Sequence, residues 1–158
     1  LSTKFAELGI ETVTYEHRPV FTVAEGEDFK KLIPGGHTKN LFLKDKNGKV
    51  WLVTALDETA IDLKKLPDRI NAARLSFGSA ELMQQLLGVT PGSVTPLALL
   101  NDTERQVRPV LDARIMEHDI MNCHPLRNDR TTCLKPQDLV KFMKNMGYEP
   151  LIVDFSRL

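Results

Sequence analysis

The chain has 158 residues, which is long enough for one domain with a proper hydrophobic core. Lysine plus arginine and aspartate plus glutamate number 21 each, so the formal net charge is zero and a polyanionic partner would have to bind a local basic patch. Two cysteines are too few for a disulfide framework, and no apolar run approaches the roughly 18 residues of a membrane span. We therefore expect a soluble, cytoplasmic domain without a signal peptide.

The first elements of the chain are short and are separated by turn signals. Apolar residues spaced through 1–8, followed by a glycine, predict the end of an amphipathic helix. Alternation over 11–16 predicts a strand. Thr22, followed three residues later by Glu25, is typical of a capping box, so a second short helix is expected to end near Leu32.

A hairpin is the strongest structural signal in the sequence. Two apolar runs, Leu41–Leu43 and Val50–Leu56, flank Asn47 and Gly48, which both tolerate positive φ. The pair predicts a two-residue type I′ turn. The first strand begins with four polar residues, His37–Asn40, where an apolar start would be usual, and this makes them the first place to look for a site.

The remaining pattern mixes short helices with short strands. The segment Thr90–Pro96 cannot be a regular central strand, because its two prolines lack the ladder donor. Helices are predicted over Asp62–Arg69, where Pro67 limits the length, over Ala80–Leu87, capped by Ser79 and ended by Gly88, and over Pro136–Met146, ended by Gly147. Further strands are predicted over Leu75–Phe77, Leu97–Leu100, Val107–Leu111, Ile120–Cys123, Thr131–Leu134 and Leu151–Phe155.

This mixture lacks a regular βαβ repeat, which indicates an α+β domain with a mixed sheet. The sequence has no internal repeat, linker or low-complexity tract, so residues 1–158 are expected to form one domain.

The polar start of the hairpin has two interpretations. Lys39 can place a positive charge on a phosphate, and Asn40 can both donate and accept hydrogen bonds. The alternative is a solvated strand start without a function.

The turn at 92–95, between Pro91 and Pro96, also has several interpretations. Backbone N–H groups held in such a turn can stabilise a developing oxyanion. Ser93 as a covalent nucleophile is a second possibility, although the Gly-x-Ser-x-Gly elbow is missing. The third is a plain β-turn stiffened by prolines.

The cysteines and histidines do not form a recognisable metal motif. Nine residues lie between Cys123 and Cys133, and five between His118 and His124, and these spacings match no common zinc pattern. Both cysteines are most simply core residues. His124 lies in a polar loop between two predicted strands, where it can move a proton, donate to a ligand or merely cap the loop.

Three blocks together resemble a known family. The blocks are His-Thr-Lys-Asn-Leu-Phe-Leu-Lys-Asp (37–45), Gly-Ser-Val-Thr-Pro-Leu-Ala-Leu (92–99) and His-Pro-Leu-Arg-Asn-Asp-Arg-Thr (124–131). They are similar to the signature blocks of the YbaK/ProX family of aminoacyl-tRNA editing domains. The first block is most similar to the free-standing ProXp-ala or PrdX-like branch, the alanyl-tRNA(Pro) deacylases.

The resemblance implies a single α+β domain over 1–158 with a mixed, partly barrel-like sheet and short surrounding helices. It implies a trans-editing hydrolase that removes alanine from tRNA(Pro) by water attack on the ester, without metal or cofactor. Lys39 would bind the terminal phosphate or orient the ester, and Asn40 would hold the substrate. Gly92 and Ser93 would offer backbone amides to the oxyanion, and His124 would shape the alanine pocket or position water.

The resemblance also implies wider contacts with the substrate. Substrate-binding residues would be His37, Thr38, Val94, Thr95, Asn128 and Thr131. Independently of the resemblance, lysines that cluster near the hairpin are candidates to bind the tRNA acceptor end: Lys30, Lys31, Lys44 and Lys46. The alternative is that Lys44 and Lys46 simply solvate an exposed strand and turn. Prolyl-tRNA synthetase or an elongation factor is a transient further partner on this hypothesis, and neither DNA nor a membrane is expected as one.

Three rival functions stay open at this point. The domain could edit another ester, such as cysteinyl-tRNA(Pro) or seryl-tRNA. It could be a tRNA- or synthetase-binding module that has lost catalysis. An unrelated serine or cysteine hydrolase is the third.

Overall fold

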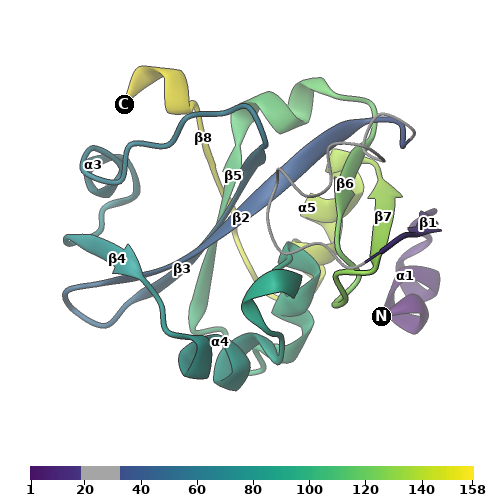
Figure 1. Ribbon diagram of the computed structural model, residues 1–158, viewed down its shortest axis with the longest axis horizontal. Coiled ribbons are helices and arrows are strands. Elements are labelled where there is room, and N and C mark those ends of the chain that lie inside the picture. The colour runs from purple at the N-terminus through teal and green to yellow at the C-terminus, as the bar shows by residue number, and fades with distance from the viewer. Residues whose placement is uncertain (19–32) are drawn as a thin grey trace.

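A computed structural model describes residues 1–18 and 33–158 (Figure 1). The short helix expected to end near Leu32 lies outside the described residues, as do Lys30 and Lys31. In the part that is described, no helix is long and apolar enough to cross a membrane.

Within the described residues, eight strands form one mixed sheet. Their order is β1-β7-β6-β2-β3-β5-β8, and β4 pairs with β2 beside this path. Three pairs of strands are parallel: β2 with β6, β3 with β5, and β5 with β8. The other pairs are antiparallel. This confirms the expected α+β class with a mixed sheet. The strands are β1 (Val13–Glu16), β2 (Gly36–Asp45), β3 (Val50–Leu56), β4 (Leu75–Phe77), β5 (Val107–Asp112), β6 (Met121–Cys123), β7 (Arg130–Leu134) and β8 (Leu151–Val153).

The helices are short and their ends follow from the sequence. They are α1 (Ser2–Leu8), α3 (Leu66–Ile70), α4 (Ala80–Leu87) and α5 (Pro136–Asn145). At α4 the Ser79 hydroxyl accepts from the Leu82 amide at 3.1 Å, and Gly88 ends the helix in the left-handed conformation, as predicted. Gly9 ends α1 in the same way.

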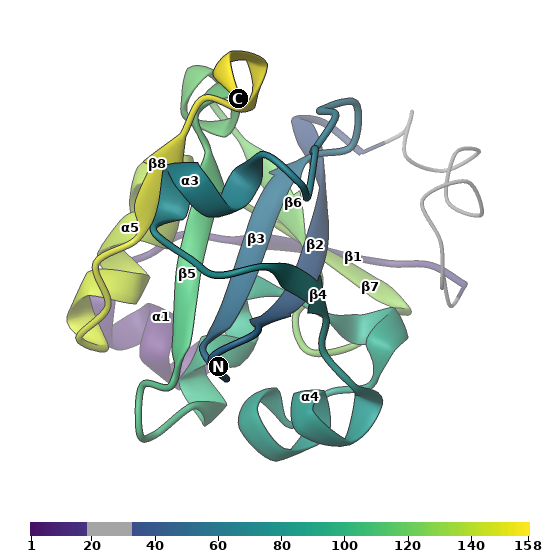
Figure 2. The same ribbon diagram turned by 90° about the vertical axis from the view of Figure 1, so that its left-hand side faces the viewer.

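Helices cover both faces of the sheet, and this explains why β3 is buried along its whole length. Phe42, Leu52 and Leu111 face a large apolar cluster with α1, α4 and α5. Their chain neighbours face the opposite cluster, which contains α3 and the C-terminal turn. In Figure 2, α3 lies in front of β3 and β5, and α1 lies beyond them. Alternation along each strand therefore divides the core into two layers.

The hairpin between β2 and β3 is present, but the prediction of a two-residue type I′ turn is wrong. Asp45 N donates to Lys49 O at 2.8 Å, and Gly48 N donates to Asp45 O at 3.0 Å. Gly48 has a φ of 85°, whereas Asn47 is not among the described residues with positive φ. The loop is therefore a type I turn followed by a left-handed glycine, the common three-residue hairpin loop. The Asp45 carboxylate favours it by accepting from the amides of Asn47 and Lys49, each at 2.9 Å.

The segment Leu97–Leu100 is not a strand, contrary to the prediction. It lies in a 3₁₀ helix, η3 (Pro96–Asn101), whose first turn holds Pro96 and whose cap is Thr95. A short buried apolar run has no periodicity that separates a strand from a helix, so the proline and the threonine cap decide the outcome.

Other element boundaries also differ from the prediction, and two of the differences have a clear local cause. Helix α3 begins at Leu66 rather than Asp62, because Pro67 fits the first turn of a helix and starts this one instead of limiting it. The last strand ends at Val153, because Asp154 caps the 3₁₀ turn η5 (Phe155–Arg157) by accepting from Ser156 N at 3.0 Å.

Candidate functional site

Two glycines bring the start of β2 against β6. Gly36 N donates to Ile120 O at 2.9 Å. Gly35 has a φ of 98°, and a Cβ at this position would lie 2.7 Å from the same oxygen. Only glycine permits this approach without moving β6. The parallel pairing that follows places His37 beside Asn122.

The side chains of His37 and Asn122 are held in place by hydrogen bonds to each other and to the backbone. His37 Nε2 lies 3.1 Å from Ile33 O, and because a carbonyl only accepts, this nitrogen carries the proton. Its Nδ1 then accepts from Asn122 Nδ2 at 3.4 Å. The Asn122 amide also donates to Pro34 O at 3.0 Å and accepts from Cys133 Sγ at 2.6 Å. This network holds β6 and β7 to the beginning of β2.

Thr38 and Asn40 lie on one face of β2 and connect it to other elements. Thr38 Oγ1 donates to Asn122 O at 2.5 Å. Asn40 Nδ2 donates to Val94 O at 3.2 Å, and Asn40 Oδ1 accepts from Thr54 Oγ1 at 2.7 Å. The Asn40 amide therefore joins two of the predicted polar clusters, at 37–40 and 92–95.

Lys39 makes its contact away from Asn40. Its Nζ donates to Thr59 O at 2.6 Å, in the turn that follows β3. Consecutive residues of a strand point to opposite faces, and Val94 accordingly belongs to the large apolar cluster, whereas Thr59 lies outside it. Lys39 and Asn40 are adjacent in sequence but serve opposite faces of the sheet. The Lys39 side chain is half-buried.

The turn at 92–95 is flanked by Pro91 and Pro96 and is buried except at Gly92. Ser93 N donates to Thr90 O at 2.9 Å within the 3₁₀ turn η2 (Pro91–Ser93). Ser93 is 7% exposed and Thr95 is fully buried. Because the Ser93 amide already has a partner in the turn, Gly92 is the better of the two candidates for donating to an oxyanion. The expectation that this segment is not a strand is confirmed.

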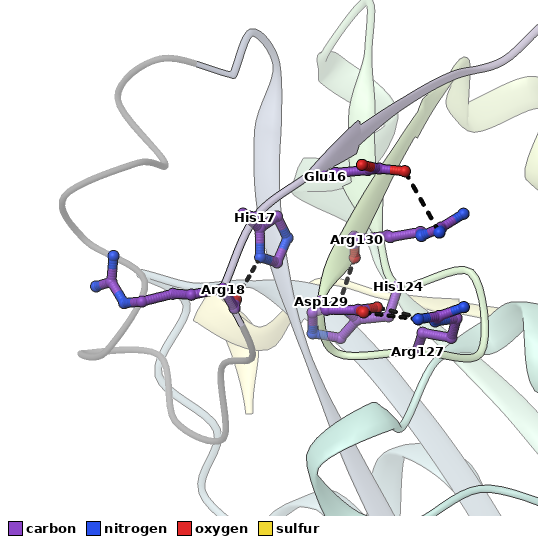
Figure 3. Close-up of polar contacts among 7 residues, drawn as sticks. All are labelled: Glu16, His17, Arg18, His124, Arg127, Asp129 and Arg130. Atoms are coloured by element: carbon purple, nitrogen blue, oxygen red, sulfur yellow. Dashed lines mark hydrogen bonds and ion pairs between the residues drawn. The ribbon is translucent and has the colours of Figure 1, made fainter.

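The loop that carries His124 is held by ion pairs and by the end of β1 (Figure 3). His124 Nδ1 lies 3.0 Å from Arg130 O, so Nδ1 carries the proton. Arg127 forms a bidentate pair with Asp129, with N–O distances of 2.9 and 2.7 Å. The hydrogen bond and charge of Arg127 hold the pKa of the Asp129 carboxyl below its ordinary value.

Contacts from β1 complete the support of this loop. His17 N donates to Asp129 O at 2.9 Å, and His17 Nε2 lies 2.8 Å from the Thr131 hydroxyl. Arg130 forms an ion pair with Glu16 at 3.3 Å (Figure 3). Thr131 is thus bound to β1, and Asn128 lies half-buried in the same loop.

The described hairpin lysines lie far from the polar start of β2. Lys44 and Lys46 are exposed at the other end of the strand, beside β4. Lys44 lies five positions after Lys39, which corresponds to roughly 16 Å along a strand.

Neither cysteine has the surroundings of a reactive thiol. Burial raises the pKa of Cys123 to about 12, and burial also raises that of Cys133. Both side chains are buried, which agrees with core residues. Within 1–18 and 33–158, no three His, Cys, Asp or Glu side chains are grouped to hold a metal ion.

Sequence reasoning missed four residues that support the site: His17, Thr59, Asp112 and Asn122. Asn122 and Asp112 carried a usable signal, because each is a polar residue within or directly after an apolar strand, and such a residue needs internal partners when buried. Thr59 and His17 carried none, since both lie in polar turns whose partners are distant in sequence.

Three comparisons with known proteins bear on this site. The family model described as "Aminoacyl-tRNA editing domain" matches residues 17–142. The chain is 40% identical over 151 residues to the prolyl-tRNA synthetase associated domain-containing protein 1 of Danio rerio, covering 94% of this chain and 82% of that protein. It is 37% identical over 145 residues to the prolyl-tRNA editing protein ProX of Acetoanaerobium sticklandii, covering 91% and 88%.

A solved structure shares the fold at low sequence identity. It is that of a proposed trans-editing enzyme for prolyl-tRNA synthetase, with a TM-score of 0.71 and 16% identity, covering 97% of this chain and 92% of the other.

Proposed function

The chain belongs to the family of aminoacyl-tRNA editing domains, and on that premise we propose that it hydrolyses alanine from mischarged tRNA(Pro). The observation that carries the proposal is the hydrogen bond from Asn40 to Val94, which joins the lysine-bearing start of β2 to the buried turn at 92–95. The relative named prolyl-tRNA editing protein ProX also supports a role in editing.

The proposed substrate has a physical rationale. A synthetase pocket shaped for proline cannot exclude a smaller amino acid, because a missing methylene costs only about 1–3 kcal/mol of discrimination. A second site that admits alanine and excludes proline by size would correct the error. Such a site must be rigid, and the internally bonded side chains around the start of β2 supply that rigidity.

The proposed mechanism needs no covalent intermediate, because an aminoacyl ester is already activated. Water attacks the ester carbonyl carbon, the bond from that carbon to the ribose oxygen breaks, and the ribose oxygen takes up a proton. The neighbouring ribose hydroxyl of the tRNA assists the attack. Lys39 binds the terminal phosphate or orients the ester, and the backbone at Gly92 stabilises the oxyanion.

Other residues of the proposed site act mainly by holding it. Asn40 fixes the 92–95 turn through Val94, and His37 and Thr38 fix β2 to β6. His124 shapes the alanine pocket or positions water, with its ring oriented by Arg130 O. On this proposal Val94, Asn128 and Thr131 form the walls around these groups, and the fully buried Thr95 holds the turn from behind by accepting from Leu97 N.

The test is hydrolysis of alanyl-tRNA(Pro), measured beside prolyl-, cysteinyl- and seryl-tRNA. We expect turnover of the alanyl ester alone, and its loss in Lys39→Ala. Lys141→Ala is the matched control, since it removes an exposed lysine of α5 that has no part in the proposed site. Preference for another ester would replace alanine in the proposal. Hydrolysis of no ester would favour a binding module for tRNA or the synthetase.

Ser93→Ala separates a backbone role from covalent catalysis. The Ser93 side chain is not required if the turn acts through its amides, so near-normal turnover is expected. Single-turnover deacylation of alanyl-tRNA(Pro) measures this, with circular dichroism as the check of folding. A folded but inactive variant would instead support a serine nucleophile.

A further inference from the structure

A buried carboxylate lies behind the contact that Lys39 makes. Asp112 ends β5 and is fully buried. Its Oδ2 accepts from Thr59 Oγ1 at 2.5 Å and from Leu56 N at 3.1 Å, and its Oδ1 accepts from Arg114 N at 3.0 Å. A buried charge is stable only with such partners, so these bonds hold the turn after β3 firmly in place.

Sheet register places this carboxylate level with Lys39. Lys39 pairs with Ala55 across β2 and β3, and Thr54 pairs with Leu111 across β3 and β5. Asp112, the next residue of β5, therefore follows beside Ala55. Ala55, which lies between them, has only a small methyl group. Thr59, in the turn after β3, contacts both Asp112 and Lys39: its hydroxyl donates to the Asp112 carboxylate, and its carbonyl accepts from Lys39 Nζ at 2.6 Å.

We propose that Asp112 and Thr59 are positioning residues that fix the Lys39 ammonium for the editing reaction. This inference rests on the proposed function for the role of Lys39 in turnover. A lysine side chain has four rotatable bonds. A hydrogen bond to the Thr59 carbonyl, which Asp112 holds in place, removes much of that freedom. Thr59 is only 4% exposed, so the carbonyl that binds Lys39 belongs to a rigid turn rather than to a mobile surface.

The test replaces the hydroxyl that joins the carboxylate to the turn. Thr59→Val keeps the shape but removes the donor to Asp112, and Thr59→Ser restores it. We expect Thr59→Val to lower kcat for alanyl-tRNA(Pro) by about tenfold or more with little change in KM, because a small misplacement of a reacting group costs rate. Thr59→Ser is expected to recover most of the loss.

A matched control separates positioning from stability. Tyr148 also donates a buried hydroxyl to a buried carboxylate, Asp102, at 2.8 Å, but near the other end of β5. Tyr148→Phe should lower the unfolding midpoint as Thr59→Val does, and should leave kcat unchanged. Equal effects of the two variants on kcat at matched stability would overturn the proposal.

A second readout does not depend on turnover. The Lys39 ε-methylene cross-peak in ¹³C-labelled protein, assigned by its absence in Lys39→Arg, reports the surroundings of the ammonium. We expect it to move in Thr59→Val, return in Thr59→Ser and stay in Tyr148→Phe. If the wild type hydrolyses no ester, the proposed function fails, yet this signal still decides the positioning. An unmoved signal in Thr59→Val would refute it.

Discussion

Lys39 and Asn40 illustrate how adjacent residues can serve one site from two faces. Lys39 reaches the turn after β3, whereas Asn40 reaches the turn at 92–95. Strand β2 needs neither a kink nor a bulge for this, because consecutive side chains of a strand point to opposite faces. Two adjacent residues of one sequence motif therefore contact different parts of the structure.

Asn40 should be more important for the position of the 92–95 turn than for binding charge. Asn40→Ala leaves the buried Thr54 hydroxyl and the Val94 carbonyl without partners, which costs about 1–3 kcal/mol of unfolding free energy. Urea unfolding measures this loss. Deacylation should fall as well, because the turn is no longer fixed.

Two variants control this prediction. Asn40→Asp still accepts from Thr54 but turns a carboxylate oxygen toward Val94 O, so it should destabilise the protein at least as much as alanine. In a double-mutant cycle, Asn40→Ala and Thr54→Val should be coupled by about 0.5 kcal/mol or more, as contacting residues are. Additive effects would show that the bond contributes nothing.

Asp45 gives a prediction about pH. Burial raises the pKa of its carboxyl, but hydrogen bonds from the amides of Ala73, Lys49 and Asn47 outweigh burial and hold the pKa below the ordinary 3.8. A carboxyl with a depressed pKa in the folded state stabilises the protein above the unfolded-state pKa, and this is lost as pH falls through the folded-state pKa.

Asp45→Asn should therefore lower the thermal midpoint at pH 7, because the new amide faces the Ala73 N–H with a second donor. The difference from wild type should shrink once the pH falls below 3.8. Thermal unfolding monitored by circular dichroism across this range measures it. Asp62→Asn, in an exposed turn with one amide partner, is the control and should change little.

At the scale of elements, the two glycines that flank β2, Gly35 before it and Gly48 after it, differ in what surrounds them. Gly35 and Gly48 both have positive φ, so alanine is strained at either position. A Cβ at Gly48 meets nothing within 4 Å, whereas a Cβ at Gly35 would lie 2.7 Å from Ile120 O. Gly35→Ala should therefore be more destabilising than Gly48→Ala by about 1–3 kcal/mol.

Urea unfolding of both variants checks this difference. Gly35→Ala should also slow deacylation, because β6 would have to move and carry Asn122 away from His37. Equal costs for the two variants would mean that strand β6 yields to the added methyl group.

Most elements could be predicted from local signals, and the failures share a cause. Ser79 and Gly88 fix α4 by their own chemistry, so both ends were correct. Leu97–Leu100 and the hairpin turn were wrong because a neighbouring polar side chain decides each of them: the Thr95 cap for the first, and the Asp45 carboxylate for the second. The supports of Lys39 could not be found in sequence, since Thr59 and Asp112 lie 20 and 73 positions further along.

At the scale of the whole molecule, the zero net charge makes the location of each basic group important. Lys39 is half-buried at one end of β2, while Lys44 and Lys46 are exposed at the other. This separation of roughly 16 Å suits a long ligand that reacts at one end and is held by its backbone further along. Proposed binding of a tRNA acceptor end fits that arrangement.

The salt dependence of tRNA binding tests this arrangement. If Lys44 and Lys46 each neutralise one phosphate, their joint replacement by alanine should reduce the slope of log Kd against log salt by about 1.5. The affinity at low salt should fall, while kcat for alanyl-tRNA(Pro) should stay unchanged because Lys39 is untouched. Lys141→Ala with Lys144→Ala, two exposed lysines of α5, removes the same charge elsewhere and should leave the slope largely unaltered. If both double variants change the slope equally, tRNA responds to overall charge, and the hairpin has no special role.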